Sequence, residues 1–163
     1  MRISEGDFSD PRVRALVTMH VTIARAQTAP ESAHALDLSS LQTPDVSFWT
    51  VHDGDALVGM GALKQLSAEH GEIKSMHTLK DMRKRGAGRQ MLRHIIETAR
   101  ARSMTRLSLE TGSWDYFYPA HRLYRGHGFV ECPPFGDYKL DPNSLFMSLD
   151  LTMEYPHGST GSP

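Results

Sequence analysis

The sequence predicts a single α/β domain in which helices cover both faces of a mixed central sheet of about six or seven strands. Segments with strand-like alternation are interspersed with segments of helical periodicity, and turn residues separate them. Their order is one strand, two helices, three strands, a helix, a strand, a helix and two strands. A chain of 163 residues is long enough for one well-packed core and too short for two ordinary domains. We expect the domain to cover residues 1–153 and residues 154–163, which have nothing to bury, to form a disordered tail.

The N-terminal part of the chain is expected to contain a short strand and two helices. The strand lies near Arg2 to Glu5. Asp10 followed by Pro11 is typical of a helix N-terminus, and apolar residues then recur at helical spacing to about Gln27. The segment PESAHALDLSSL, which starts at Pro30, is interpreted as a second, shorter helix or a helical turn.

Strands and helices alternate along the rest of the chain. The DGD stretch between two apolar segments is a tight turn, which predicts a hairpin. Met91, Ile95 and Ala99 share one face of a later helix whose charged residues point elsewhere, so this helix is amphipathic. Gly128 follows the last helix and is a typical C-terminal stop. The expected elements are a hairpin over Val46 to Leu66, a strand over Gly71 to Leu79, a helix over Gly88 to Arg102, a strand over Arg106 to Thr111, a helix over Pro119 to His127, and strands in GFVEC and SLFMSLDL.

Composition excludes several classes of protein. The formal net charge is −1 and the pI is about 6.7, so no overall basic field would attract nucleic acid or an anionic membrane. Cys132 is the single cysteine and fits a reducing compartment, and no apolar stretch approaches the length that spans a membrane. We therefore expect a soluble, cytoplasmic protein. The nine histidines show none of the spacings typical of metal ligands, and we predict no metal site.

A basic, glycine-containing segment, MRKRGAGRQML, lies between the expected fourth strand and the amphipathic helix. Arg83, Gly86 and Gly88 form the pattern R-x-x-G-x-G. Bare N–H groups at a helix N-terminus, the positive end of the helix dipole and adjacent guanidinium groups favour an anion. The alternative is a turn whose charges are only solvated. No Lys-Ser or Lys-Thr pair completes a P-loop, and Met91 stands where a dinucleotide fingerprint would need its third glycine.

Together with the element order and the later stretch AHRLYRGHGF, this pattern resembles the GCN5-related N-acetyltransferase (GNAT) superfamily over nearly the whole chain. The resemblance implies that the anion is the pyrophosphate of acetyl-CoA and that main-chain groups around Met76 and Thr78 bind its pantetheine arm. Phe117 stands where the family often has an asparagine, which puts one customary cofactor hydrogen bond in question. The cofactor-binding residues implied by the resemblance are Met76, His77, Thr78, Arg83, Lys84, Arg85, Gly86, Ala87, Gly88, Arg89 and Tyr124.

The resemblance also implies how acetyl transfer would be catalysed. Tyr124 matches the family's usual general acid, which protonates the departing thiolate, although a buried tyrosine is often only a packing residue. A main-chain N–H near Met76 would support the oxyanion. Glu72 on the fourth strand is the first candidate for the general base and Glu110 on the fifth is the second. Either carboxylate can instead be paired at the surface, which is the commoner role of glutamate.

Alternation along the fourth strand decides the order of these candidates. It places Glu72, Lys74 and Met76 on one face and His77 on the opposite face, so His77 is a weaker candidate for the base. Lys74 beside the cleft would favour an acceptor that carries a carboxylate or phosphate as well as its amine. The alternative is that Lys74 lies on the surface, as strand lysines usually do.

The stretches APESAHALDL, HGEIKSM, LSLETGS and DPNSLFM resemble a bacterial branch of the superfamily that includes YsnE. Members of that branch are sometimes labelled indole-acetate acetyltransferases, but indole acetate has no basic amine for the usual chemistry. Polar residues in these stretches are the candidates for the acceptor cleft, although each can equally be a cap or a turn residue. They are Glu31, Ser32, His34, Lys74 and Thr111.

We therefore predict an N-acetyltransferase that moves an acetyl group directly from acetyl-CoA to a primary amine of a small molecule or peptide. The alternative is a protein of the same fold that senses acyl-CoA without turnover or serves as an assembly partner. A nucleic-acid contact by the basic turn is disfavoured by the net charge, which is close to zero. No membrane partner is expected, and a homodimer is possible because many members of the superfamily dimerise.

Overall fold

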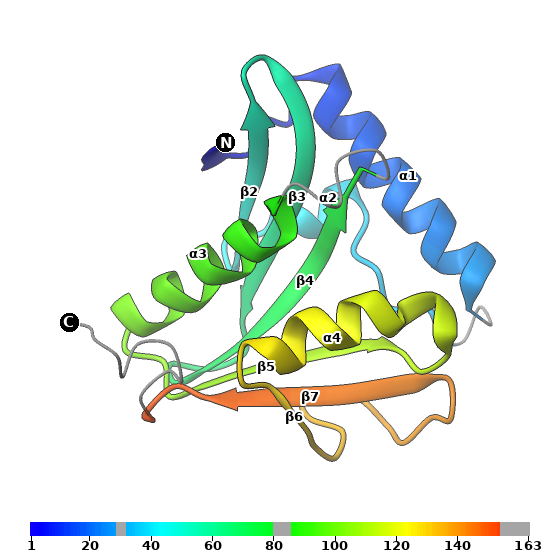
Figure 1. Cartoon of the computed structure of the whole chain (residues 1–163), viewed down its shortest axis with the longest axis vertical. Coiled ribbons are helices and arrows are strands. Elements are labelled where there is room, and N and C mark those ends of the chain that lie inside the picture. The colour runs from blue at the N-terminus through cyan, green and yellow to red at the C-terminus, as the bar shows by residue number, and fades with distance from the viewer. Residues whose placement is uncertain (29–31, 80–85, 154–163) are drawn as a thin grey trace.

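The computed structural model describes residues 1–28, 32–79 and 86–153 (Figure 1). Their strands form one seven-stranded sheet with the order β1-β2-β3-β4-β5-β7-β6. Only β4 and β5 pair in parallel, so the expected mixed sheet is confirmed. The elements are β1 (Arg2–Glu5), α1 (Pro11–Gln27), α2 (Leu38–Leu41), β2 (Val46–Asp53), β3 (Ala56–Gln65), β4 (His70–Thr78), α3 (Ala87–Ala101), β5 (Arg106–Gly112), the 3-10 helix η3 (Asp115–Phe117), α4 (Tyr118–Gly126), β6 (Val130–Glu131) and β7 (Ser144–Asp150).

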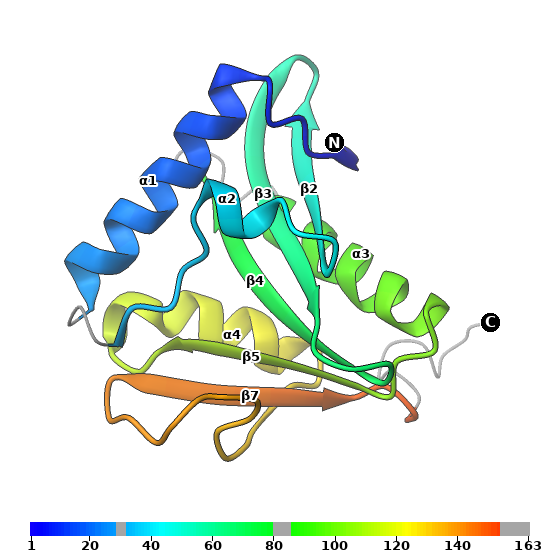
Figure 2. The same ribbon diagram turned by 180° about the vertical axis from the view of Figure 1, so that it is seen from behind.

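Helices cover both faces of this sheet, as the sequence predicts. Figure 1 shows α3 and α4 in front of the strands, and Figure 2, seen from behind, shows α1 and α2 in front. Met91 and Ile95 of α3 pack with Leu107 into one apolar cluster. Leu16 of α1 packs with Met60 into a second cluster on the other face. None of the helices in the described ranges combines the length and the apolar character needed to cross a membrane.

The second helix is shorter than the sequence suggests, because only α2 is helical and the residues directly before it form no regular element. Tertiary contacts hold this preceding segment in an irregular path. The Ser32 hydroxyl donates a hydrogen bond to Asp141, and the His34 carbonyl accepts one from Lys74 Nζ at 3.0 Å. These partners lie on distant segments, so they override a local helical pattern that the sequence alone displays.

The parallel strands β4 and β5 are paired only over their N-terminal halves. The last paired residues are Ile73 and Leu109. Beyond them the two strands diverge toward their C-terminal ends, as Figures 1 and 2 both show. The divergence opens a space in the sheet, and it leaves the β5-facing edge of β4 without a strand partner in the described chain.

A β-bulge in β4 lies at the start of this divergence. Met60 of β3 pairs with His77 while Ala62 pairs with Lys74, so β4 has one residue more than β3 in this interval. Ser75, inside the bulge, has a φ of 58°. Its hydroxyl is buried and has no hydrogen-bond partner among the described residues.

The bulge makes the alternation expected for β4 wrong beyond Lys74. Met76 packs with Ile73 against the apolar cluster of α3, whereas the alternation would place it with Lys74. His77 instead contacts His20 of α1, on the opposite face. An inserted residue shifts every following side chain to the other face of a strand, and strand alternation in a sequence does not reveal the insertion.

Gly128 ends α4 through a backbone conformation that favours glycine, because its φ is 94°. We expect Gly128→Ala to lower the free energy of unfolding by about 1 kcal/mol, as a Cβ is strained at this φ. Gly126→Ala is the matched control, since a Cβ added at this last residue of α4 meets nothing within 4 Å. Urea denaturation followed by circular dichroism should show a loss only for Gly128→Ala, and equal losses would contradict this account.

Candidate active site

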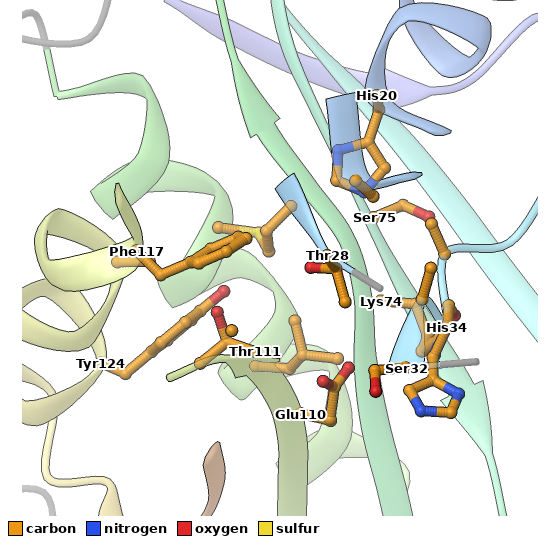
Figure 3. Close-up of a pocket in the computed structure, with 17 residues that line it drawn as sticks. His20, Thr28, Ser32, His34, Lys74, Ser75, Glu110, Thr111, Phe117 and Tyr124 are labelled. Carbon is orange, nitrogen blue, oxygen red and sulfur yellow. The ribbon is translucent and has the colours of Figure 1, made fainter. Parts of the chain in front are cut away.

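Two cavities lie in the opening between β4 and β5 and join into one cleft. The inner cavity, of about 150 Å³, is lined by β4, β5, α1, α4 and the segment after α1 (Figure 3). The outer cavity, of about 840 Å³, extends along β4 and α4 to the N-terminus of α3. Residues that line both cavities mark their junction, and these are His20, Ala24, Met76, Phe117, Ala120 and Tyr124.

Most of the site residues predicted from the sequence line this cleft. Those in the outer cavity are Met76, His77, Thr78, Gly86, Gly88, Arg89 and Tyr124. Those in the inner cavity are Ser32, His34, Lys74, Met76, Glu110, Thr111 and Tyr124. Two do not line either cavity: Ala87, which is buried in the core, and Glu72. The expectations for Pro30, Glu31, Arg83, Lys84, Arg85 and the tail of residues 154–163 lie outside the described residues.

The N-terminus of α3 closes one end of the outer cavity. Gly86 is the N-cap of the helix and has a φ of 86°, a conformation that favours glycine. A Cβ added at Gly88 would lie 3.5 Å from Thr78 Oγ1, so the bare helix backbone faces β4 closely. The first N–H groups of a helix lack partners within it, and the Arg89 and Arg122 side chains line the same cavity. This end of the cleft is therefore suited to a diphosphate or a similar anion.

The main chain of β4 supplies polar groups to the middle of the cleft. The pairing of β4 with β5 ends at Ile73, so the later part of β4 has no neighbouring strand on that side in the described chain. Backbone N–H and C=O groups need hydrogen bonds, and a bound molecule can provide them where a strand does not. A main-chain N–H is also the kind of donor that stabilises an oxyanion.

Tyr124 of α4 is 6% exposed and lies at the junction of the two cavities. In Figure 3 its hydroxyl points toward the cavity, in the direction of Thr111. Burial raises the pKa of Tyr124 above its ordinary value, and the negative charge of Glu110 raises it further. The phenol therefore stays protonated near neutral pH, which is the form required of a general acid.

Glu72 belongs to a closed polar network on β4. Its Oε2 accepts a hydrogen bond from the Tyr138 hydroxyl at 2.6 Å and lies 3.4 Å from Lys74 Nζ. Lys74 also donates to the Tyr138 hydroxyl at 2.9 Å. The three side chains satisfy one another, so Glu72 is held as the partner of a cation.

Glu110 of β5 is the carboxylate that faces the inner cavity (Figure 3). Its Oε2 accepts a hydrogen bond from the Ser144 hydroxyl at 2.8 Å. Burial raises the pKa of Glu110, and this effect exceeds the opposing effects of Ser144, His34 and Lys74. A carboxylate of raised pKa is a better base than an exposed one. The geometry thus favours Glu110 over Glu72, which reverses the order suggested by alternation along β4.

The sequence analysis missed His20, which lies on α1 and lines both cavities. Its Nδ1 is 3.0 Å from His77 Nδ1, so one of the two rings donates to the other. Burial, followed by the effects of His77 and Lys74, lowers the pKa of His20 to about 4, and the ring is neutral at pH 7. One feature of the sequence could have identified His20: it lies four residues after Leu16 and four before Ala24, so it falls on the apolar face of the helix.

Comparisons with known proteins agree with this geometry. The profile of the acetyltransferase (GNAT) family matches residues 15–129, which is more than half of the chain. The chain belongs to this family. It is a GNAT-family N-acetyltransferase, and the superfamily resemblance stated from its motifs is confirmed.

Three relatives share much of the sequence. The uncharacterized N-acetyltransferase YedL of Escherichia coli K12 is 48% identical over 149 residues, which cover 91% of this chain and 94% of the relative. The uncharacterized N-acetyltransferase YsnE of Bacillus subtilis 168 is 47% identical over 151 residues, covering 93% and 100%. A protein named IAA acetyltransferase from Azospirillum brasilense is 40% identical over 124 residues, covering 74% and 78%. The resemblance to the YsnE branch is thus also confirmed.

Solved structures share the fold of this GNAT-family protein. A Klebsiella pneumoniae protein, provisionally assigned as an acyl-CoA N-acyltransferase, matches with a TM-score of 0.77 and 26% identity, over 92% of this chain and 97% of the other. A GNAT-family acetyltransferase from Elizabethkingia anophelis with acetyl-CoA bound matches with a TM-score of 0.66 and 15% identity, over 91% and 97%. The second likeness concerns the fold alone.

Tyr138 connects Glu72 and Lys74, so its hydroxyl should contribute to stability. We expect Tyr138→Phe to lower the free energy of unfolding by about 1–3 kcal/mol, because both charged partners lose a buried hydrogen bond. Tyr118→Phe is the matched control, since Tyr118 is 48% exposed and its change should stay within about 0.5 kcal/mol. Chemical denaturation of both variants tests the network, and an unchanged midpoint for Tyr138→Phe would refute it.

Proposed function

We propose that this enzyme transfers an acetyl group directly from acetyl-CoA to a primary amine of a small molecule or peptide. One observation carries the proposal: a carboxylate of raised pKa, Glu110, and a protonated phenol, Tyr124, line the same inner cavity. Tyr124 also lines the outer cavity. A base for the amine and an acid for the departing thiolate therefore face one space, beside the place suited to the cosubstrate.

Acetyl-CoA fits the chemistry of the outer cavity. The diphosphate would bind the first N–H groups of α3, with Arg89 and Arg122 adding positive charge. The amides of the pantetheine arm would bind main-chain groups of β4 around Met76 and Thr78, beyond the last residue that pairs with β5. The buried, unpartnered Ser75 hydroxyl near this edge is a further polar group that a bound molecule can satisfy.

The cleft provides a donor and an acceptor for each proton that moves in the proposed transfer. The amine nitrogen forms a bond to the acetyl carbon, Glu110 accepts the proton that the amine loses, and the β4 main chain supports the oxyanion. As the carbon–sulfur bond breaks, the Tyr124 hydroxyl gives its proton to sulfur. The proton held by Glu110 then passes through the cavity to the Tyr124 oxygen, which restores the neutral phenol. Glu72 would be able to act as the base only after release from Lys74 and Tyr138.

The rival function is an acyl-CoA sensor or assembly module on the same fold. A sensor needs the outer cavity but has no use for a buried carboxylate of raised pKa facing a buried phenol. Thiol release from acetyl-CoA in the presence of amines separates the two functions, since a sensor binds the cofactor without releasing the thiol.

Gly88→Trp tests the cofactor site. The indole would fill the space beside Thr78 and Leu123, so we expect acetyl-CoA binding by isothermal titration calorimetry to be lost while the protein stays folded. Gly126→Trp is the control, because a Cβ added there meets nothing within 4 Å and Gly126 does not line the cleft. Unchanged affinity in Gly88→Trp would exclude the outer cavity as the cofactor site.

Tyr124→Phe tests the general acid. Removing the hydroxyl should lower kcat by about 100-fold or more, with little change in acetyl-CoA affinity, because only the proton transfer to sulfur is lost. Tyr118→Phe, on the exposed side of the same helix, should keep full activity. Thiol release and calorimetry measure the two quantities, and a fully active Tyr124→Phe enzyme would remove Tyr124 from the mechanism.

A further inference from the structure

One lysine, Lys74, lines the inner cavity, but its ammonium group is already bonded to groups of the protein. Lys74 is the only lysine or arginine among the described residues that line this cavity. An ammonium group has three N–H donors. Three acceptors surround Lys74 Nζ: the His34 carbonyl at 3.0 Å, the Tyr138 hydroxyl at 2.9 Å and Glu72 Oε2 at 3.4 Å. No donor remains for a carboxylate or phosphate of the acceptor, and the charge is neutralised by Glu72.

The remaining charge around the inner cavity is negative. Glu110 lines it and receives one hydrogen bond, from the neutral Ser144 hydroxyl. Asp141 accepts a hydrogen bond from the hydroxyl of Ser32, which lines the cavity. This bond lowers the pKa of Asp141, so the carboxylate is charged near neutral pH. His20 is neutral at pH 7 because its pKa is about 4.

The two ends of the cleft therefore carry opposite charge. Arg89, Arg122 and the N-terminus of α3 make the outer cavity positive. Glu110 makes the inner cavity negative, and the neighbouring Asp141 adds to its potential. Such a division directs an anionic cosubstrate to one end and a cationic acceptor to the other.

We propose that the acceptor is a compact, cationic primary amine that carries no carboxylate or phosphate next to its amino group. This inference rests on the proposed function and names the acceptor class for the same site. The ammonium group docks against Glu110 and releases one proton to solvent, and the neutral amine then reacts as described above. An anionic substituent beside the amino group meets the same carboxylate without a lysine or arginine to compensate. The earlier expectation that Lys74 selects an anionic acceptor is thereby replaced.

The size of the inner cavity limits the reacting end of this amine. A volume of about 150 Å³ holds on the order of ten water-sized groups. One side of the cavity is lined by Ser32, His34 and Lys74, and the other side is lined by Phe117 and Tyr124 (Figure 3). A single ring or a short alkyl chain on the amine matches this space.

The test compares related acceptors that carry or lack a negative charge beside the amino group. For phenylalanine, tyrosine and histidine, the free amino acid, its amide and its decarboxylated amine are assayed with the wild-type enzyme and acetyl-CoA at mildly alkaline pH. We expect kcat/KM for each amide and amine to exceed that of the free acid by about tenfold or more. Equal rates for acids and amides would overturn the inference while leaving acetyl transfer intact.

Glu110→Gln shows whether this preference comes from the carboxylate. Amides and acids differ in the basicity of their amino groups, but that difference is the same for both enzymes. The ratio of amide to acid kcat/KM should therefore fall toward one in Glu110→Gln. It should stay at the wild-type value in Glu97→Gln, which changes an exposed glutamate of α3 outside the cleft. An unchanged ratio in Glu110→Gln overturns the role of Glu110. Acetyl-CoA binding by calorimetry verifies that both variants are folded.

A second measurement separates this inference from the proposed function. Binding of phenethylamine and of phenylalanine to the protein loaded with CoA is measured by calorimetry. If the wild type releases no thiol with any amine, acetyl transfer is refuted, yet selective binding of phenethylamine still supports the acceptor class. Absence of such selectivity overturns it.

Discussion

The divergence of β4 and β5 after Ile73 and Leu109 is the constraint on which the rest of the site depends. Two parallel strands normally continue their pairing, since unpaired backbone groups inside a protein are costly. Here the bulge at Ser75, with its positive φ, breaks the register of β4 with β3 at the same level. The strand edge that results is polar and faces a cavity. A bound molecule can satisfy it, so a defect in the sheet becomes a binding surface.

The apolar packing on both faces holds this opening in place. The cluster around α3 fixes the helix whose N-terminus ends the outer cavity, and the cluster around α1 fixes His20 at the junction. The wall of the inner cavity is held differently, by polar bonds between segments far apart in sequence. Ser32 bonds to Asp141, and Lys74 bonds to the His34 carbonyl. The shape of the inner cavity thus depends on a few hydrogen bonds, and that of the outer cavity on the core.

Environment separates two glutamates that look alike in the sequence. Glu72 and Glu110 lie on neighbouring strands, but only Glu72 has a lysine and a tyrosine as direct partners among the described residues. The Lys74 ammonium group neutralises the charge of Glu72, while burial raises the pKa of Glu110. Glu72 is held in an ion pair, whereas Glu110 has the raised pKa that suits the proposed proton transfer.

The sequence by itself determined the order of elements, the helix that starts at the glycine pair and the stop at Gly128. These features depend on local spacing and turn chemistry, which neighbouring residues decide. Only the tertiary structure decided which carboxylate is free, that Lys74 is saturated, and that the chain before α2 is not helical. The deciding hydrogen bonds join residues 40 to 109 positions apart, and the bulge at Ser75 shifts a register that alternation assumes constant. Periodicity in a sequence predicts which face of a helix or strand a side chain lies on, but it does not predict which distant residue contacts that side chain.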